Sequence, residues 1–387
     1  MIGFDLSEEQ KRFQELAHEF AEKEMRPVAA QYDETEEFPW PVVEKAGELG
    51  LLTYGFPEEF GGAGVTSALT ICLIGEELAW GCAGMSSAMG GVMLGASPIL
   101  LSGTDAQRKK YLPLLAQKKK DGRPPLGAFA LTEPEAGSDA AALKASAKKV
   151  DGGYLLNGTK HFITNGGIAD VYTVFATHDP ALGADGIDAF IVEGGWKGVK
   201  PGKKERKMGI RASHTAQVHF EDVFVPAENR IGEEGEGFLV AMKTLEFSRP
   251  GVAAGALGVA RAAFEFALAY SMERKQFGRA IAKQQAISFM LADMITEIDA
   301  ARLLTWRSAW LLDQGLPANK EASMAKRFAG DTAMKVATDA VQIVGGAGYM
   351  RDLPVEKYMR DAKIMQIYEG TSQIQRLVIS RFLIGFG

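Results

Sequence analysis

The stretch ISFMLADMITEIDAA, residues 287–301, carries the clearest structural pattern in this chain. Its apolar side chains lie at Ile287, Leu291, Met294, Ile298 and Ala301. They recur every three or four residues, which is the spacing of one face of an α-helix. The pattern continues to about residue 313, and three further long segments after residue 237 share it. Wide apolar faces need partners, so we expect an antiparallel helical bundle that also packs against other subunits.

The segment from Ser7 to Arg123 is also helical in pattern. Ser7 with Gln10 predicts a capping box, and four apolar residues follow at helical spacing: Phe13, Leu16, Ala17 and Phe20. Turn residues at 56–62 separate this helix from a later one, and the sequence DGRPP at 121–125 ends the region.

The middle of the chain has a different texture, with short β-rich runs broken by Gly, Asp, Asn and Pro. The runs are 172–176, 189–192 and 217–220. We therefore predict three domains: a helical one at 1–125, a β domain at 126–238 and a helical bundle at 239–387. The fold class is α+β, mainly α.

Composition and charge exclude several classes of protein. The net charge is −6, and the longest basic run, Lys118 to Lys120, has no interleaved aromatics, so no nucleic-acid partner is expected. We expect that run to be a solvated helix end. Residues 78–104 carry no charge, but six glycines and Pro98 interrupt them, which favours a buried helix pair beside a pocket over a membrane span. Cys72 and Cys82 are too few for a disulfide framework and are expected to be buried.

The first residues, with Asp5, Glu8 and Glu9, show neither a signal peptide nor a transit peptide. We expect a cytoplasmic protein of bacterial type, or one of the mitochondrial matrix only if a transit peptide has been removed. The five histidines lack zinc-site spacing, so no metal is expected, and no Rossmann, P-loop or serine-hydrolase motif occurs.

What remains is a set of polar, glycine-rich turns beside apolar structure. They are LTEPEAGSD at 131–139, NGTKHFITNG at 157–166 and QIVGGAG at 342–348. Glycine lets a backbone approach a ligand closely, and Thr and Ser hydroxyls can bond to ring or phosphate atoms. Taken alone, each turn is better explained as an ordinary loop, because Gly, Pro, Asn and Asp mostly mark loops.

Together and in this order, the turns resemble those of the acyl-CoA dehydrogenase family over residues 7–381. Three further motifs carry the resemblance: MERKQFG at 272–278, YMRDLPVEKYMRDAK at 349–363 and QIYEGTSQIQR at 366–376. The resemblance implies an N-terminal α domain, a middle β-barrel-like domain and a C-terminal four-helix bundle. These agree with the boundaries drawn from periodicity.

The resemblance implies FAD as cofactor and assigns residues to it. One wall of the site is expected from Phe129, Leu131, Thr132, Gly137 and Ser138, and another from Phe162 and Thr164. Many relatives carry Trp where this chain has Phe162. A neighbouring subunit of a homotetramer is expected to complete the ADP half through Arg274, Phe277, Gln284, Gln285, Gln342 and Gly346. Further FAD contacts are expected from Thr371 and Gln373.

The resemblance also implies a base, Glu369, that removes the α-proton of an acyl-CoA while FAD takes a β-hydride. A carboxylate against an apolar substrate loses hydration, which strengthens it as a base. Some relatives place the base one residue before Arg249, but here that residue is Ser248 and cannot act as a base. Substrate contacts are expected from Ser138, Glu246, Arg249, Tyr368 and Gly370. A buried ion pair in the bundle is the alternative role for Arg249, and a surface ion pair is the alternative for Arg274.

The acyl pocket should come largely from residues 78–101, which carry no charge and therefore favour a monocarboxylic acyl group, short, medium or branched. The expected product is the trans-2-enoyl-CoA, and electron-transferring flavoprotein is the family's usual acceptor. Three alternatives stay open on the sequence: an acyl-CoA oxidase, an enoyl-CoA reductase, and a flavin-containing binding protein without catalysis.

Overall fold

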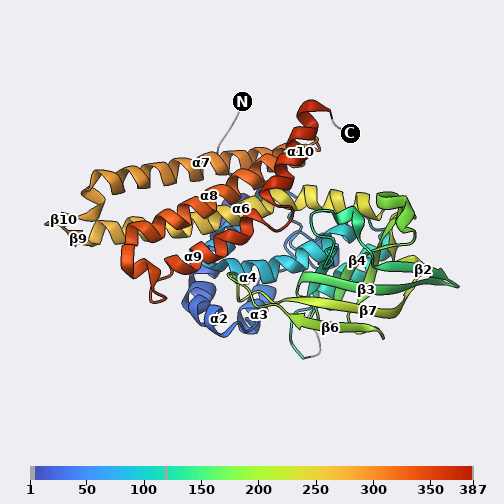
Figure 1. Cartoon of the computed structure of the whole chain (residues 1–387). Helices are drawn as coiled ribbons and strands as arrows, with labels where there is room; N and C mark the ends of the chain where they lie inside the picture. The colour runs from blue at the N-terminus through green and yellow to red at the C-terminus, as the bar shows by residue number, and fades with distance from the viewer. Residues whose placement is uncertain (1–4, 118–120, 386–387) are drawn as a thin grey trace.

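The computed structural model describes residues 5–117 and 121–385, arranged as a helical part, a β-sheet and a helical bundle (Figure 1). The expectation for Lys118 to Lys120 lies outside the described residues. The N-terminal helices are α1 (Glu8–Phe20), α2 (Ala29–Thr35), α3 (Trp40–Glu48), α4 (Ala68–Ser102) and α5 (Asp105–Ala116). The predicted capping box is confirmed: Ser7 Oγ accepts from Gln10 N at 3.1 Å, and Gln10 Oε1 accepts from Ser7 N at 2.9 Å.

Helix α4 contains a break that turns it into the expected helix pair. Cys82 has φ −165° and ψ 113°, which no helix allows. Before the break α4 packs on α6 (Gly237–Glu273), where a Cβ on Gly258 would lie 2.2 Å from the Glu76 carbonyl oxygen. After the break it packs on the sheet, where a Cβ on Gly95 would lie 2.4 Å from Ala128 N. The break thus lets one segment contact both the bundle and the sheet.

The middle region forms one sheet in the order β6-β7-β3-β2-β4-β5-β8, with β1 paired in parallel to β4. Its strands are β1 (Gly127–Ala130), β2 (Ser146–Val150), β3 (Gly153–Thr164), β4 (Val171–Thr177), β5 (Ile187–Glu193), β6 (Val199–Lys204), β7 (Thr215–Pro226) and β8 (Arg230–Ile231). All three β-rich runs found in the sequence lie inside β4, β5 and β7. Strands β4 and β5 are buried along nearly their whole length, which explains their continuous apolar character.

The bundle consists of α6 with α7 (Gln285–Asp313), α8 (Asn319–Val344) and α10 (Ser372–Ile384), and the short α9 (Val355–Ala362) lies between α8 and α10 in the chain. A small hairpin, β9 (Lys275–Gln276) and β10 (Arg279–Ala280), lies at the end of the bundle away from the sheet (Figure 1). Helices α4 and α6 are long and apolar enough to cross a membrane by length and composition. In each, however, more than half of the most apolar window is buried inside the protein, as in core helices.

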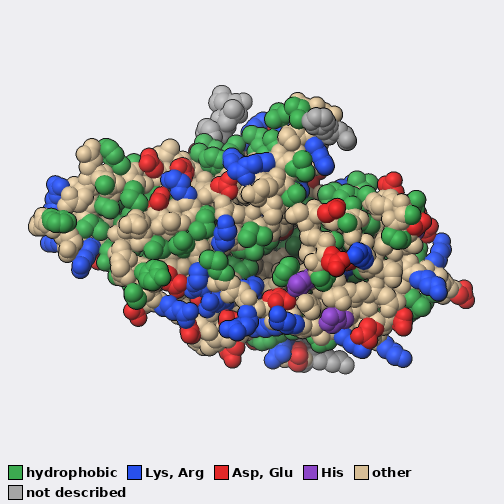
Figure 2. Space-filling model, viewed as in Figure 1, with side chains coloured by type: hydrophobic (Ala, Val, Ile, Leu, Met, Phe, Trp, Pro, Cys, Tyr) green, Lys and Arg blue, Asp and Glu red, His purple; other side chains and the backbone are tan. Residues whose placement is uncertain are grey.

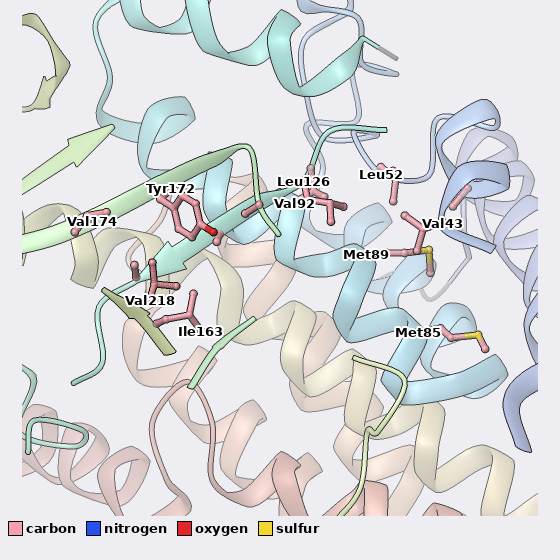
Figure 3. Packing of buried hydrophobic residues seen from close by; sticks show 14 of the residues in the cluster. Val43, Leu52, Met85, Met89, Val92, Leu126, Ile163, Tyr172, Val174 and Val218 are labelled. Carbon is pink, nitrogen blue, oxygen red and sulfur yellow. The ribbon is translucent and has the colours of Figure 1, made fainter. Parts of the chain in front are cut away.

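The largest hydrophobic core joins the N-terminal helices to the sheet through α4 (Figure 3). Met85, Met89 and Val92 of α4 pack between Val43 and Leu52 on one side and the sheet on the other. A second core lies inside the bundle and is rich in alanine from α6 and α8. Both cysteines are buried and free, as expected.

Two adjacent carboxylates of α4, Glu76 and Glu77, are buried where α4 meets the bundle. Arg261 of α6 donates to Glu77 Oε1 at 2.8 Å and to Glu76 Oε1 at 3.2 Å, and Arg302 of α7 donates to Glu76 at 2.9 Å. Their side chains are 3–4% exposed. Because a buried charge needs compensation, the arginines are required for the two helices to pack here.

We predict that Arg261→Met lowers the free energy of unfolding by about 3 kcal/mol, because the buried Glu77 loses its arginine and keeps only Gln14 and His18 as partners. Urea denaturation followed by far-ultraviolet circular dichroism measures the change. The matched control is Arg307→Met, because the Arg307 side chain is 57% exposed and pairs with Glu321. Its free energy of unfolding should fall by less than about 1 kcal/mol. Equal losses in the two variants would contradict a special role for the buried pair.

Candidate functional site

A cavity of about 1330 Å³ lies where α4, α6, the sheet and the loop before α10 meet. The molecular surface is hollowed between the bundle and the sheet (Figure 2). The volume exceeds the roughly 300–1,000 Å³ of a pocket for one small ligand. Every residue that α4 contributes to the lining is uncharged, from Ile71 to Ser97.

Glu369 lies on the wall of this cavity in a loop with unusual backbone geometry. Its φ is 50°, and the next residue, Gly370, has φ 94°. A left-handed conformation is strained for a residue with a Cβ. The buried Gln375 holds the loop, since its Nε2 donates to the carbonyl oxygens of Glu369 and Gly370, both at 3.1 Å. Thr371 then caps α10 by accepting from Ile374 N at 3.2 Å.

The Glu369 carboxylate is anchored by α6. Ser248 Oγ donates a hydrogen bond to Oε2. Burial raises the pKa of Glu369 above its usual range, while the Ser248 hydrogen bond and the charges of Lys326 and Arg249 oppose that rise. The net effect is a carboxylate that binds a proton more strongly than one in water.

Arg249 is buried beside this carboxylate. Its Nη1 donates to Asn319 Oδ1 at 2.8 Å and to Ser323 Oγ at 3.4 Å, and its buried Nε has no partner. Both acceptors are neutral. Within the described part of the chain Arg249 has no carboxylate within 4 Å, so the alternative of a buried ion pair is wrong.

Lys326 is a second buried cation at the same loop. Its side chain is fully buried, and Nζ donates to the Gly370 carbonyl oxygen at 2.7 Å. Asn319, Ser323 and Lys326 are spaced by four and three residues, so they lie on one face of α8. That face contacts both Arg249 and the glutamate loop.

On the sheet side, the loop 131–139 is fixed by a buried carboxylate. Glu133 accepts from Lys160 Nζ at 2.7 Å and from the backbone N–H groups of Lys144 and Ala145 at 2.7 and 2.9 Å. The Thr132 carbonyl accepts from the N–H of residue 161 at 2.8 Å. These bonds hold Thr132 and the loop around it at the cavity wall.

The second sheet element at the cavity is the end of β3. Phe162 has φ 57°, is 61% exposed and stacks on His161 at 3.8 Å between ring centroids. His161 Nε2 lies 3.1 Å from Glu205 Oε1, which fixes the imidazole under the phenyl ring. Thr164 lies two residues further along β3 and lines the cavity, and its methyl group would lie 3.0 Å from a Cβ placed on Gly91 of α4.

The hydroxyl groups on this wall fit a large ligand with polar edges. Among the described residues, no protein partner exists for the side-chain oxygens of Thr132, Ser138 and Thr164. Likewise no acceptor exists for the Glu369 backbone N–H. Hydroxyl groups that line a cavity without a protein partner are free to bond to a polar ligand bound there.

The structure brings together most of the residues predicted for the site. The cavity is lined by Phe129, Leu131, Thr132, Gly137, Ser138, Phe162, Thr164, Arg249, Tyr368, Glu369, Gly370 and Thr371. Two predicted residues lie near it without lining it: Glu246, which accepts from Ala318 N at 3.3 Å, and Gln373, which is exposed on α10.

The residues predicted to bind the ADP half lie elsewhere on the chain. Within one chain none of them lines the cavity: Arg274, Phe277, Gln284, Gln285, Gln342 and Gly346. Phe277, in the turn of the β9–β10 hairpin, is 95% exposed. Arg274 is exposed, and its alternative role as a surface ion pair, like its role in binding FAD, stays a prediction. Their role in binding FAD stays a prediction.

Three residues of the site were missed by sequence reasoning. Ser248 was considered only as a failed base, and neither Lys326 nor Gln375 was singled out. The signal for Lys326 was present: three polar residues at helical spacing, Asn319, Ser323 and Lys326, interrupt an otherwise alanine-rich face. The spacing does not reveal what this face contacts, because Arg249 and the glutamate loop come from distant segments of the chain.

Comparisons with known proteins cover nearly the whole chain. Three family models match: Acyl-CoA dehydrogenase, N-terminal domain, at residues 7–119; middle domain at 128–223; and C-terminal domain at 235–384. A "short-chain specific" acyl-CoA dehydrogenase of Clostridium acetobutylicum is 48% identical over 98% of this chain and 99% of its own length.

Two solved structures have the same fold. Butyryl-CoA dehydrogenase from Megasphaera elsdenii has a TM-score of 0.95 and 46% identity, covering 99% of this chain and 100% of its own. A chain solved in work on the electron transferring flavoprotein of Acidaminococcus fermentans has a TM-score of 0.95 and 48% identity, with coverage of 99% and 100%.

We predict that Glu369→Gly is more stable than Glu369→Ala by about 1 kcal/mol, because glycine adopts the left-handed conformation without strain. Urea unfolding of the two variants gives the difference. The control pair is Glu246→Gly and Glu246→Ala inside helix α6, where the order should reverse by about 1 kcal/mol because glycine is unfavourable within a helix. The same order at both positions would contradict strain at Glu369.

Proposed function

The chain belongs to the acyl-CoA dehydrogenase family, and we propose that it oxidises a short- to medium-chain or branched monocarboxylic acyl-CoA with Glu369 as the base. The family is FAD-dependent. When bound, FAD supplies the acceptor for the hydride that leaves Cβ. The product is the trans-2-enoyl-CoA.

One observation carries this proposal: Glu369 shares a single cavity with the unpaired hydroxyls of Thr132, Ser138 and Thr164. A base and a cofactor wall must face the same space if a proton and a hydride are to leave neighbouring carbons. The residues present therefore fit FAD along the sheet wall and an acyl group between that wall and Glu369. Phe162 is the aromatic part of the wall.

Proton removal from a thioester needs both a base and stabilisation of the enolate oxygen. The raised pKa of Glu369 makes its carboxylate a better acceptor at neutral pH. The unpaired Glu369 N–H is available to donate to the thioester oxygen, where charge develops as the proton leaves. The Ser248 hydrogen bond limits the positions that the carboxylate can take.

The acyl group is inferred from the far end of the cavity. The α4 side of the lining is uncharged, which disfavours a second carboxylate on the substrate. On α6, a Cβ added to Gly251 would meet no atom within 4 Å, so there is open space beside the acyl path. The relatives named short-chain specific and butyryl-CoA dehydrogenase support a small acyl group.

A homotetramer is the proposed assembly. The predicted ADP-half residues do not reach the cavity of their own chain, so a neighbouring copy would complete the site. Large exposed apolar side chains on the bundle support such a contact: Phe277 is 95% exposed, Tyr349 79%, Met272 63% and Phe289 59%. Exposed apolar groups of this kind mark interaction surfaces.

Electron-transferring flavoprotein is the proposed electron acceptor, supported by the similar chain from the work on that protein of Acidaminococcus fermentans. Oxygen as acceptor would make the enzyme an oxidase, and the reverse reaction would make it an enoyl-CoA reductase. A flavin-containing protein without catalysis would leave the buried base without use. Turnover with the purified acceptor, measured with and without oxygen, distinguishes these outcomes.

The test of the proposed function is bleaching of oxidised FAD without oxygen by a panel of acyl-CoAs. The panel runs from butyryl to palmitoyl and includes isobutyryl, isovaleryl and glutaryl. Rapid bleaching by short, medium or branched monocarboxylic members is expected, and glutaryl should bleach slowly. If bound FAD is bleached by none of them, the proposed function is wrong.

We predict that Glu369→Gln still binds FAD and acyl-CoA but loses flavin reduction by several orders of magnitude, because no proton acceptor remains. In the wild type the rate should fall as the pH is lowered through the raised pKa of Glu369, since only the ionised carboxylate accepts a proton. Stopped-flow bleaching measures both effects. The control is Glu233→Gln, whose side chain is 87% exposed and whose flavin should be reduced at the wild-type rate. A near-normal rate of flavin reduction in Glu369→Gln would show that Glu369 is not the base.

A further inference from the structure

Lys326 differs from the other buried lysines of the described chain. Lys160 pairs with Glu133 at 2.7 Å, and Lys357 pairs with Asp361 at 2.6 Å. Lys326 is as buried as Lys160 but has no carboxylate within 4 Å among residues 5–117 and 121–385. Burying a cation without a counter-ion is costly, so folding alone gives no reason for a lysine here.

The one hydrogen bond of Lys326 goes to the loop that carries the base. Nζ donates to the carbonyl oxygen of Gly370, the residue after Glu369, at 2.7 Å. Gln375 Nε2 donates to the same oxygen at 3.1 Å, so the carbonyl would keep a donor without the lysine. The specific contribution of Lys326 is therefore its positive charge.

We propose that Lys326 is a positioning residue for the base: its hydrogen bond to Gly370 holds the ammonium group at the glutamate loop, which keeps a positive charge beside the Glu369 carboxylate. This rests on the proposed function. The proton passes from the substrate Cα to Glu369, and Lys326 exchanges none. Its charge offsets the burial of the carboxylate, so Glu369 stays ionised until the substrate arrives.

The other charged groups around the loop do not replace Lys326. Asp331 of α8 is paired with Arg376 of α10 and Arg327 of its own helix, at 2.9 and 3.4 Å. Arg249 of α6 adds a second positive charge near the loop. Glu246 on the same helix carries a negative charge, which favours the charged form of Arg249. No charged residue of α4 lines this cavity.

Further charged groups line other parts of the cavity, and Tyr368 beside the base is kept neutral because burial raises its pKa. The charged lining residues outside the loop are Glu133, Asp139, Glu205, Arg206, Lys207, Arg360, Lys363 and Arg381. None of them is among the groups that shift the pKa of Glu369.

The titration of Lys326 supports the same inference. Burial lowers its pKa to about 8, while the charge of Glu369 opposes that change. As the pH rises through this value, the lysine loses its charge and Glu369 becomes a carboxylate beside Arg249 alone. The influence of Lys326 on the base is therefore fully present near neutral pH and below.

The test is the pH profile of flavin reduction in Lys326→Met holoenzyme. The acid limb should move up by about one pH unit or more, which is a loss of about tenfold in rate on that limb. At pH values above the moved limb the rate should approach that of the wild type. Lys326→Arg should restore the wild-type limb, and Lys326→Gln should behave like Lys326→Met.

Lys335→Met is the matched control, because Lys335 lies on the same helix and pairs with Glu297 and Asp339 away from the loop. Its acid limb should equal that of the wild type. A readout independent of activity is the infrared band of the protonated carboxyl that disappears in Glu369→Gln. Its titration midpoint should rise in Lys326→Met by the same amount as the limb.

An unchanged limb and an unchanged infrared midpoint in Lys326→Met would overturn the inference and leave the proposed function standing. A Lys326→Met protein that does not fold would also overturn it, since the lysine would then be structural. If no acyl-CoA bleaches the FAD bound to the wild-type enzyme, the proposed function is contradicted instead. The infrared midpoint would then still test the effect of Lys326 on the pKa of Glu369.

Discussion

The close approach of α4 and α6 is the constraint on which the other parts of the structure depend. At Gly258 the two backbones are so near that a Cβ would overlap the Glu76 carbonyl oxygen. This contact joins the N-terminal helices to the bundle, and the break at Cys82 then turns α4 toward the sheet. The cavity is lined by α4 together with residues 238–255 of α6, the part of α6 that precedes Gly258.

The balance of buried charge differs between the contact of α4 with the bundle and the surroundings of Glu369. Glu76 and Glu77 are each matched by an arginine, so their energetic role is to hold α4 on the bundle. Around Glu369 the balance is different, with two buried cations and one carboxylate. Removing one partner of a matched buried pair destabilises the fold, whereas the surplus of positive charge near Glu369 favours negative charge in the cavity.

Periodicity and turn residues were sufficient for the architecture of this chain. The face at 287–301, the capping box at Ser7 and the β-rich runs all lie where the structure has helices and strands, because each signal is local. The stretch at 78–104 predicts a helix pair; the structure has one break, at Cys82, and the helix then continues through Pro98 to Ser102, so glycine and proline did not locate the break. Helix α6, which lies outside that stretch, is also long and apolar enough to cross a membrane by length and composition.

The site was only partly predictable, and the reason is spatial. Glu369 and the glycine-rich turns at 131–139 and 157–166 belong to short motifs, so a single segment carries each signal. Ser248, Lys326 and Gln375 act through contacts between segments far apart in the chain, and no local pattern reveals such a contact. The ion-pair role considered for Arg249 failed for the same reason: the neutral Asn319 and Ser323 face it across the bundle.

The distance of Arg274 and Phe277 from the cavity of their own chain links cofactor retention to self-association. If a second copy supplies these residues, as proposed, FAD is held by the assembly rather than by one polypeptide. Mass action then couples the two equilibria: dilution that separates subunits releases flavin, and added flavin favours reassociation. Loss of yellow colour on dilution would report on quaternary structure before any change in helix content.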